Sequence, residues 1–155
     1  MAVERLVAGT EGNASARAGE LVVISPSGLA YDALRPEDVA LVEADGTLVE
    51  GPPPSVELPM HLAVLGARPD VGAVVHTHSP HATARPTVPV AEGRSGTVEL
   101  GSAVVAALGG GDAVVIRAHG PVCVGRDLAA ALACAIELEE AARSYSKSSG
   151  SRPSR

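Results

Sequence analysis

Two short apolar runs restrict the fold of this sequence more than any other feature. VGAVV occupies positions 71–75 and AVVI occupies 113–116. Neither run alternates apolar with polar residues, so each predicts a strand that is buried on both faces of a sheet. Such strands need helices on both sides. We therefore expect an α/β fold: a three-layer α/β/α sandwich around a central mixed, mainly antiparallel sheet.

The remaining elements follow from turn and capping residues. Hairpins are predicted at 14–24, around Ala18-Gly19, and at 39–51, around Asp45-Gly46. Helices are predicted at 56–67 with Ser55 as the N-cap, at 79–84, at 97–108, and after Asp127. The end of a further helix is expected at 3–8.

One domain accounts for the whole pattern. The chain has 155 residues, no Phe and no Trp, so its core must consist of Val, Leu, Ala and Ile. We expect a single domain over 1–145 and a disordered tail over 146–155, where the sequence is rich in Ser and basic residues.

Charge and hydropathy narrow the classes of partner. The net charge of −6, without a cluster of Lys or Arg, predicts that the protein binds neither nucleic acid nor an anionic membrane surface. There is no basic leader followed by an apolar core, and no apolar run long enough to cross a bilayer. We expect a cytoplasmic protein.

The motif HTHSPH, at 76–81, gathers three of the five histidines directly after the first apolar run. On a continued strand, His76 and His78 would face the same side and could share one ion. Catalytic zinc sites commonly use three protein ligands, and His119, just after the second apolar run, is the candidate for the third. His81 competes as a ligand, although Pro80 separates it from the strand. The alternative is a pair of hydrogen-bonded histidines without a metal.

An acidic residue and two small-residue loops accompany these histidines. Glu57 lies four residues before His61 on a predicted helix, where it either exchanges protons near a metal or interacts with the helix dipole. Backbone N–H groups and neutral side chains in two loops are suited to holding a phosphate, although such loops are often plain turns. The candidates are Gly12, Asn13 and Ser15 in the first loop, and Ser27 and Gly28 in the second.

In this order the segments resemble the class II aldolase/adducin family, and within it the L-fuculose-1-phosphate aldolase-like proteins. The matching strings are GTEGNAS at 9–15, SPSG at 25–28, SVELPMH at 55–61, HTHSPH at 76–81 and RAHG at 117–120. Together they span nearly the whole chain.

The resemblance implies a zinc-dependent aldolase that cleaves a small phosphorylated ketose. It implies His76, His78 and His119 as ligands of Zn²⁺ or another divalent metal, and Glu57 as the catalytic acid/base. It places Asn13, Ser27, Gly28 and Ser55 at the phosphate of the substrate. It also implies a homotetramer with sites at subunit boundaries.

Other readings of the same resemblance stay open. Related epimerases typically carry Asp at the position of Glu57. The glutamate of this chain therefore favours cleavage of a carbon–carbon bond. Epimerisation or decarboxylation of a sugar or sugar-acid phosphate is the alternative. A non-enzymatic adducin-head-like binding module is less consistent with the chain, because such modules tend to lose the metal ligands. Val56 replaces a serine that is usual in the family.

The chain departs from the family after Ala84. Family members carry a helix end, a loop and a strand between HATA (81–84) and PTVPV (86–90), and that stretch usually contributes a tyrosine to a neighbouring subunit. Either the chain is a shortened member, or the sequence omits a stretch here. The omission is favoured, because a true break would leave a strand of the sheet without a partner.

Overall fold

The computed structural model describes residues 1, 6–7, 10–84 and 86–149, and for 146–149 only the backbone. The strands are β1 (Asn13–Ala18), β2 (Leu21–Ile24), β3 (Ala40–Val42), β4 (Leu48–Glu50), β5 (Ala73–His76), β6 (Val90–Ala91), β7 (Ala113–Ile116) and β8 (Gly120–Gly125). The helices are α1 (Leu58–Ala67), α2 (Pro80–Ala84), α3 (Val98–Leu108) and α4 (Leu128–Ser149), with a short 3₁₀ helix at Pro36–Asp38.

The strands form one sheet in the order β4-β3-β2-β1-β5-β8-β7-β6. All neighbouring pairs are antiparallel except β6 with β7. The two apolar runs of the sequence form β5 and β7, and β8 lies between them. The predicted mixed, mainly antiparallel sheet is confirmed.

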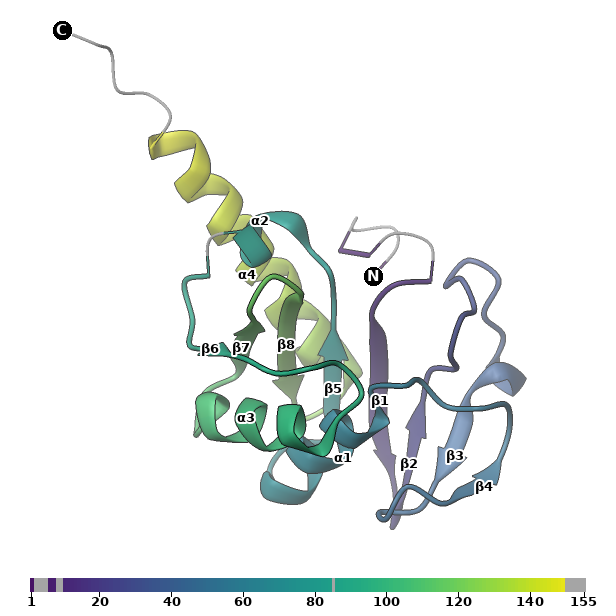
Figure 1. Cartoon of the computed structure of the whole chain (residues 1–155). Helices are drawn as coiled ribbons and strands as arrows, with labels where there is room; N and C mark the ends of the chain where they lie inside the picture. Colours follow the sequence, from purple (N-terminus) through teal and green to yellow (C-terminus); the bar gives the residue numbers. More distant parts are fainter. Residues whose placement is uncertain (2–5, 8–9, 85, 150–155) are drawn as a thin grey trace, which may run out of the picture.

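Helices cover both faces of this sheet (Figure 1). On one face, α1 and α3 pack their leucines and valines, such as Val64 and Val104, against Val74 and Val114. On the other face, α2 and α4 pack small side chains against Ala73, Val75 and Cys123. The three-layer arrangement is thus as predicted, and its core contains neither Phe nor Trp.

The helix predicted at 56–67 begins two residues later than expected. It starts at Leu58, so Ser55 is not its N-cap; Glu57 takes that position, and its side chain makes no capping hydrogen bond. The Ser55 hydroxyl instead accepts a hydrogen bond from the backbone N–H of Glu57, at 3.3 Å. The carboxylate of Glu57 is therefore free to point away from its own helix.

The strand predicted from the apolar run at 71–75 does not continue to His78, because β5 ends at His76. His78 lies in the segment that turns into α2 at Pro80, so strand alternation does not place it beside His76. The expectation that both histidines share one face of a strand is wrong, because the chain leaves the sheet between them. Their proximity results from the turn instead.

Val90 and Ala91 form β6, a strand that the sequence pattern did not predict. β6 pairs with β7 at the edge of the sheet, so among the described strands none lacks a partner. The hairpins at β1–β2 and β3–β4 are confirmed.

The two ends of the chain are described only in part. α4 continues to Ser149, so it includes the first residues of the segment expected as a tail, and 150–155 lie outside the described residues. Most of the helix expected at 3–8 also lies outside them. Within the described chain, no helix combines the length and apolarity needed to cross a bilayer.

Candidate metal centre

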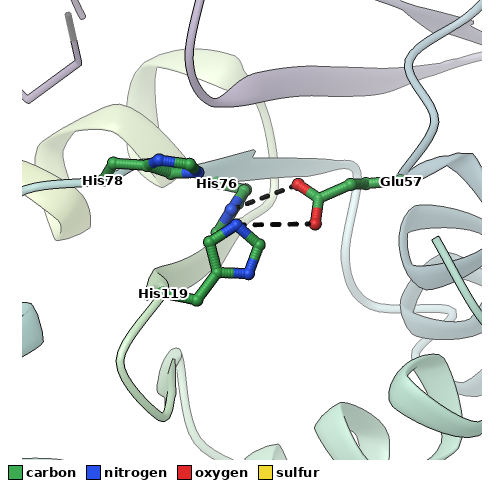
Figure 2. A group of neighbouring side chains, drawn as sticks. All are labelled: Glu57, His76, His78 and His119. Atoms are coloured by element: carbon green, nitrogen blue, oxygen red, sulfur yellow. Dashed lines mark ion pairs between the residues drawn. The ribbon is translucent and has the colours of Figure 1, made fainter. Parts of the chain in front are cut away.

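Four side chains from separate parts of the chain converge at one end of the sheet: those of Glu57, His76, His78 and His119. Their candidate ligand atoms all lie within 4.8 Å of one another. The imidazole rings are mutually close, with centroids 4.6 to 5.1 Å apart. Figure 2 shows the Glu57 carboxylate pointing at the group from the start of α1, opposite His76 and His119. Three imidazoles and one carboxylate are a donor set suited to zinc.

His76 is oriented by the backbone of β8. Its Nδ1 lies 2.9 Å from the carbonyl oxygen of Pro121, which can only accept, so Nδ1 carries the proton. In the neutral ring Nε2 then has a lone pair, and this atom is buried without a hydrogen-bond partner. It lies 3.2 Å from Oε2 of Glu57. A lone pair facing a carboxylate is unfavourable unless a cation lies between them, so the site fits a metal ion.

His119 reaches the site from the tight turn between β7 and β8. Its backbone N–H donates to the carbonyl of Ile116 at 3.0 Å, and Ala118 adopts a left-handed conformation with φ 54°. The next residue, Gly120, passes so close to Thr77 that a Cβ would lie 1.9 Å from its carbonyl oxygen. This close approach of the two segments brings the His119 ring beside His76 and His78, and Nε2 of His119 lies 3.8 Å from Oε1 of Glu57.

The Glu57 carboxylate is held by two further side chains. Asn13, at the start of β1, donates from Nδ2 to Oε2 at 2.9 Å. Ser95, in the segment before α3, donates its hydroxyl to Oε1 at 2.6 Å. The carboxylate is buried, with 4% of Glu57 exposed, but each of its oxygens accepts a hydrogen bond.

Burial and neighbouring groups shift the protonation of the site. Burial raises the pKa of Glu57, but the adjacent His76 and the hydrogen bonds from Ser95 and Asn13 together outweigh it, so its pKa lies below the ordinary value. Burial lowers the pKa of His76 to about 4, and burial followed by the proximity of His119 lowers that of His78. At neutral pH, Glu57 is therefore ionised while His76 and His78 are neutral, as metal ligands must be.

A cavity opens beside these groups and is lined by most of the predicted phosphate residues. Asn13, Ser27, Gly28 and Ser55 all border it, together with Glu57, His78 and His119. Ser27 and Gly28 are brought there by a bridge between Pro26 and Pro54. Ser15 is not among its lining residues: it is 2% exposed and its hydroxyl contacts His61. The structure therefore brings together every predicted site residue except Ser15.

Two residues of this region were not predicted from the sequence pattern. Ser95 is a single serine in the loop EGRSGT, and nothing in that loop indicates that it would face Glu57. His61 was noted only for its spacing from Glu57, whereas the structure makes it a wholly buried neighbour of Asn13. His81, the competing ligand, belongs to α2 and is not part of the group; its backbone N–H donates to Glu139.

Comparison with known proteins agrees with this geometry. The sequence profile of the family described as Class II Aldolase and Adducin N-terminal domain matches residues 1–87 and 84–146. The two matches meet just where the sequence departs from the family resemblance, after Ala84.

Individual relatives include both aldolases and epimerases. The chain is 40% identical, over 157 residues, to a 5-methylthioribulose-1-phosphate/5-deoxyribulose-1-phosphate aldolase of Rhodospirillum rubrum, covering 88% of this chain and 71% of the relative. It is 34% identical to the L-ribulose-5-phosphate 4-epimerase UlaF of Salmonella paratyphi B, covering 89% and 75%. Among solved structures, an L-fuculose 1-phosphate aldolase superposes with a TM-score of 0.89 at 29% identity, covering 96% and 81%.

Proposed function

Because the chain belongs to the class II aldolase and adducin family, as one of its enzymes, we propose that it is a zinc-dependent aldolase acting on a small ketose 1-phosphate. The products would be a ketone phosphate of the dihydroxyacetone phosphate type and a short aldehyde. The observation that carries this proposal is the convergence of three histidines on the ionised carboxylate of Glu57.

His76, His78 and His119 would hold the metal in this proposal. The buried Nε2 of His76 supports its role, because its other ring nitrogen is already bound to the Pro121 carbonyl. Zn²⁺ suits three imidazole nitrogens, and other divalent ions accept them as well. A divalent ion held there would supply Lewis-acid polarisation of the substrate carbonyl.

Glu57 would act as the acid/base. In the cleavage, the bond between carbons 3 and 4 of the ketose breaks, the hydroxyl of carbon 4 loses its proton and becomes the aldehyde, and the electron pair stays with carbon 3. Glu57 lies at the cavity wall, where its ionised carboxylate would accept the proton of the carbon 4 hydroxyl and then deliver it to carbon 3. Asn13 and Ser95 would hold the carboxylate in place for this transfer.

The substrate phosphate would be bound by neutral groups. Ser27, Gly28, Ser55 and Asn13 border the same cavity as His78 and His119. Glycine and hydroxyl donors of this kind bind phosphate without a charged side chain. We leave Ser15 out of this set, because its hydroxyl is buried against His61.

The choice of substrate follows the more similar relative. A 5-deoxyribulose 1-phosphate or 5-methylthioribulose 1-phosphate would satisfy the proposed chemistry, since both are ketose 1-phosphates and the Rhodospirillum rubrum relative is named for them. Epimerisation is the second candidate, because UlaF is also similar to this chain. Glu57, in place of the Asp typical of epimerases, favours the aldolase.

Purified protein loaded with zinc tests this proposal. Incubation with 5-deoxyribulose 1-phosphate should release a ketone phosphate and an aldehyde in equal amounts, and Glu57→Gln should remove most turnover while retaining the metal. The same preparations should leave ribulose 5-phosphate unchanged. Conversion of ribulose 5-phosphate without aldehyde release would instead favour the epimerase, and an unchanged rate in Glu57→Gln would exclude the role given to that residue.

Two further proposals rest on the family resemblance. The protein would assemble as a homotetramer, and it would act in the cytoplasm. Size-exclusion chromatography with light scattering tests the first, and fractionation of the source cells tests the second.

A further inference from the structure

Two buried polar side chains form a series of contacts that ends at the amide of Asn13: Ser15 contacts His61, and His61 contacts Asn13. His61 lies on α1, one turn after Glu57, and is 0% exposed; Ser15 lies on β1, two residues after Asn13, and is 2% exposed. The Ser15 hydroxyl lies 2.7 Å from Nδ1 of His61, and Nε2 of His61 lies 2.5 Å from Oδ1 of Asn13. Neither His61 nor Ser15 borders the cavity.

The donors and acceptors in this chain of contacts permit one arrangement. The carboxylate of Glu57 can only accept, so the Asn13 group that faces it at 2.9 Å is the Nδ2 amine. The amide oxygen of Asn13 must then face His61, and because that oxygen also only accepts, Nε2 of His61 carries a proton. A neutral imidazole has one N–H, so Nδ1 accepts from the Ser15 hydroxyl.

The imidazole stays neutral here. Burial, followed by the proximity of His76, lowers the pKa of His61 to about 3. A charged ring would donate from both nitrogens, so the Ser15 hydroxyl would accept; only the neutral ring makes Ser15 the donor to Nδ1. The hydrogen bonds then run in one direction, from Ser15 to His61, from His61 to Asn13 and from Asn13 to Glu57.

We infer that His61, held as its Nε2–H tautomer by Ser15, is a positioning residue that fixes the Asn13 amide and thereby the carboxylate of Glu57. If the amide turned over, its oxygen would face Oε2 of Glu57 and its amine would face an N–H, so both contacts would be lost in a buried place. The inference rests on the proposed function only for the acid/base role of Glu57.

The surrounding backbone leaves these side chains little freedom. Asn13 and Ser15 lie on β1, which is paired on both sides: Asn13 faces His76 of β5, and Ser15 faces Val74 of β5 and Ile24 of β2. This relay of Ser15, His61 and Asn13 therefore lies between β1, which pairs with the strand that carries His76, and α1, whose N-cap is Glu57. A buried and fully satisfied network of this kind specifies one geometry.

A matched pair of variants at Ser15 separates this role from simple packing. Ser15→Thr and Ser15→Val add the same bulk to a buried position, but only Thr keeps the hydroxyl. In zinc-loaded protein, the relay predicts that Ser15→Thr retains turnover, whereas Ser15→Val loses about 10- to 100-fold in kcat, because a displaced catalytic group costs rate of this order. Zinc content should be equal in the two.

Nitrogen NMR of histidine-labelled protein reads the tautomer directly. Wild type and Ser15→Thr should show His61 neutral at pH 7 with the proton on Nε2, and Ser15→Val should show a mixture of tautomers. Should the two variants fail to fold, the wild-type spectrum alone decides the tautomer, and Ser15→Ala, which adds no bulk, replaces Ser15→Val.

The outcomes are distinct. A proton on Nδ1 of His61 in the wild type, a charged ring at pH 7, or equal turnover in the Thr and Val variants would overturn the relay. A wild-type protein that cleaves no ketose phosphate would overturn the proposed function, and the NMR spectrum would still decide the relay.

Discussion

Adding one methyl group at Gly120 should weaken metal binding without touching a ligand. Gly120 follows His119 and crosses the segment that carries His76 and His78. A Cβ there would lie 1.9 Å from the carbonyl oxygen of Thr77 and 3.2 Å from the Cα of His78. Real Cβ atoms essentially never come closer than 3.0 Å to such an atom, and here the neighbour is backbone, which cannot simply rotate away.

The size of the effect follows from these distances. The two segments must separate by about 1 Å, whereas zinc sites tolerate about 0.2 Å in ligand distances. We expect Gly120→Ala to reduce zinc affinity by about 10- to 100-fold, as loss of a supporting contact does in other zinc sites. Overpacking of this kind should also lower the free energy of unfolding by about 1–3 kcal/mol.

Calorimetric titration of the metal-free protein with zinc measures the affinity, and urea denaturation measures the stability. Gly110→Ala is the matched control, because a Cβ at Gly110 would meet no atom within 4 Å. It should bind zinc as the wild type does. If Gly120→Ala also kept the wild-type affinity, then the close approach of the Gly120 and Thr77 segments would not be what positions His119.

Three further predictions concern the same site. His119→Ala should release the metal, and a variant that still carries stoichiometric zinc by elemental analysis would show that another group is the third ligand. Ser95→Ala should lower kcat about tenfold with zinc content unchanged, because Oε1 of Glu57 loses its donor; wild-type kcat in this variant would contradict that role. Acid should destabilise the metal-free protein: burial lowers the pKa of His61 to about 3 and of His76 to about 4, while unfolded imidazoles bind protons below about pH 6.5. Between pH 6.5 and 5, each of these two histidines should therefore lower the free energy of unfolding by about 1 kcal/mol per pH unit. Urea denaturation with a chelator present measures this free energy at each pH, and a value that does not change with pH would contradict the prediction.

The layered fold could be predicted because its signals are local. The continuous apolar runs at β5 and β7 mark strands that must be covered on both faces, and Asp45-Gly46 marks a hairpin turn. Each of these depends on a few neighbouring residues. β6 could not be found in this way, because two residues carry no periodicity and become a strand only by pairing with β7.

Among the site residues, the kind of chemistry was readable and the geometry was not. Three histidines and a glutamate in those strings indicate a metal site, but the reason offered for the proximity of His76 and His78 was wrong, since β5 ends at His76. Ser15 illustrates the same limit. A serine in a small-residue loop looks like a phosphate donor until the register of β1 turns it toward His61.

The amino-acid sequence by itself determined which residues are available for chemistry and which segments must be buried, because residue type and apolar periodicity are properties of the chain alone. Only the tertiary structure decided which atoms meet. Ser95 reaches Glu57 across 38 positions of sequence, and His61 reaches Asn13 across 48. Contacts between residues so far apart in the sequence depend on how helices and strands pack, and no short stretch of sequence encodes that packing.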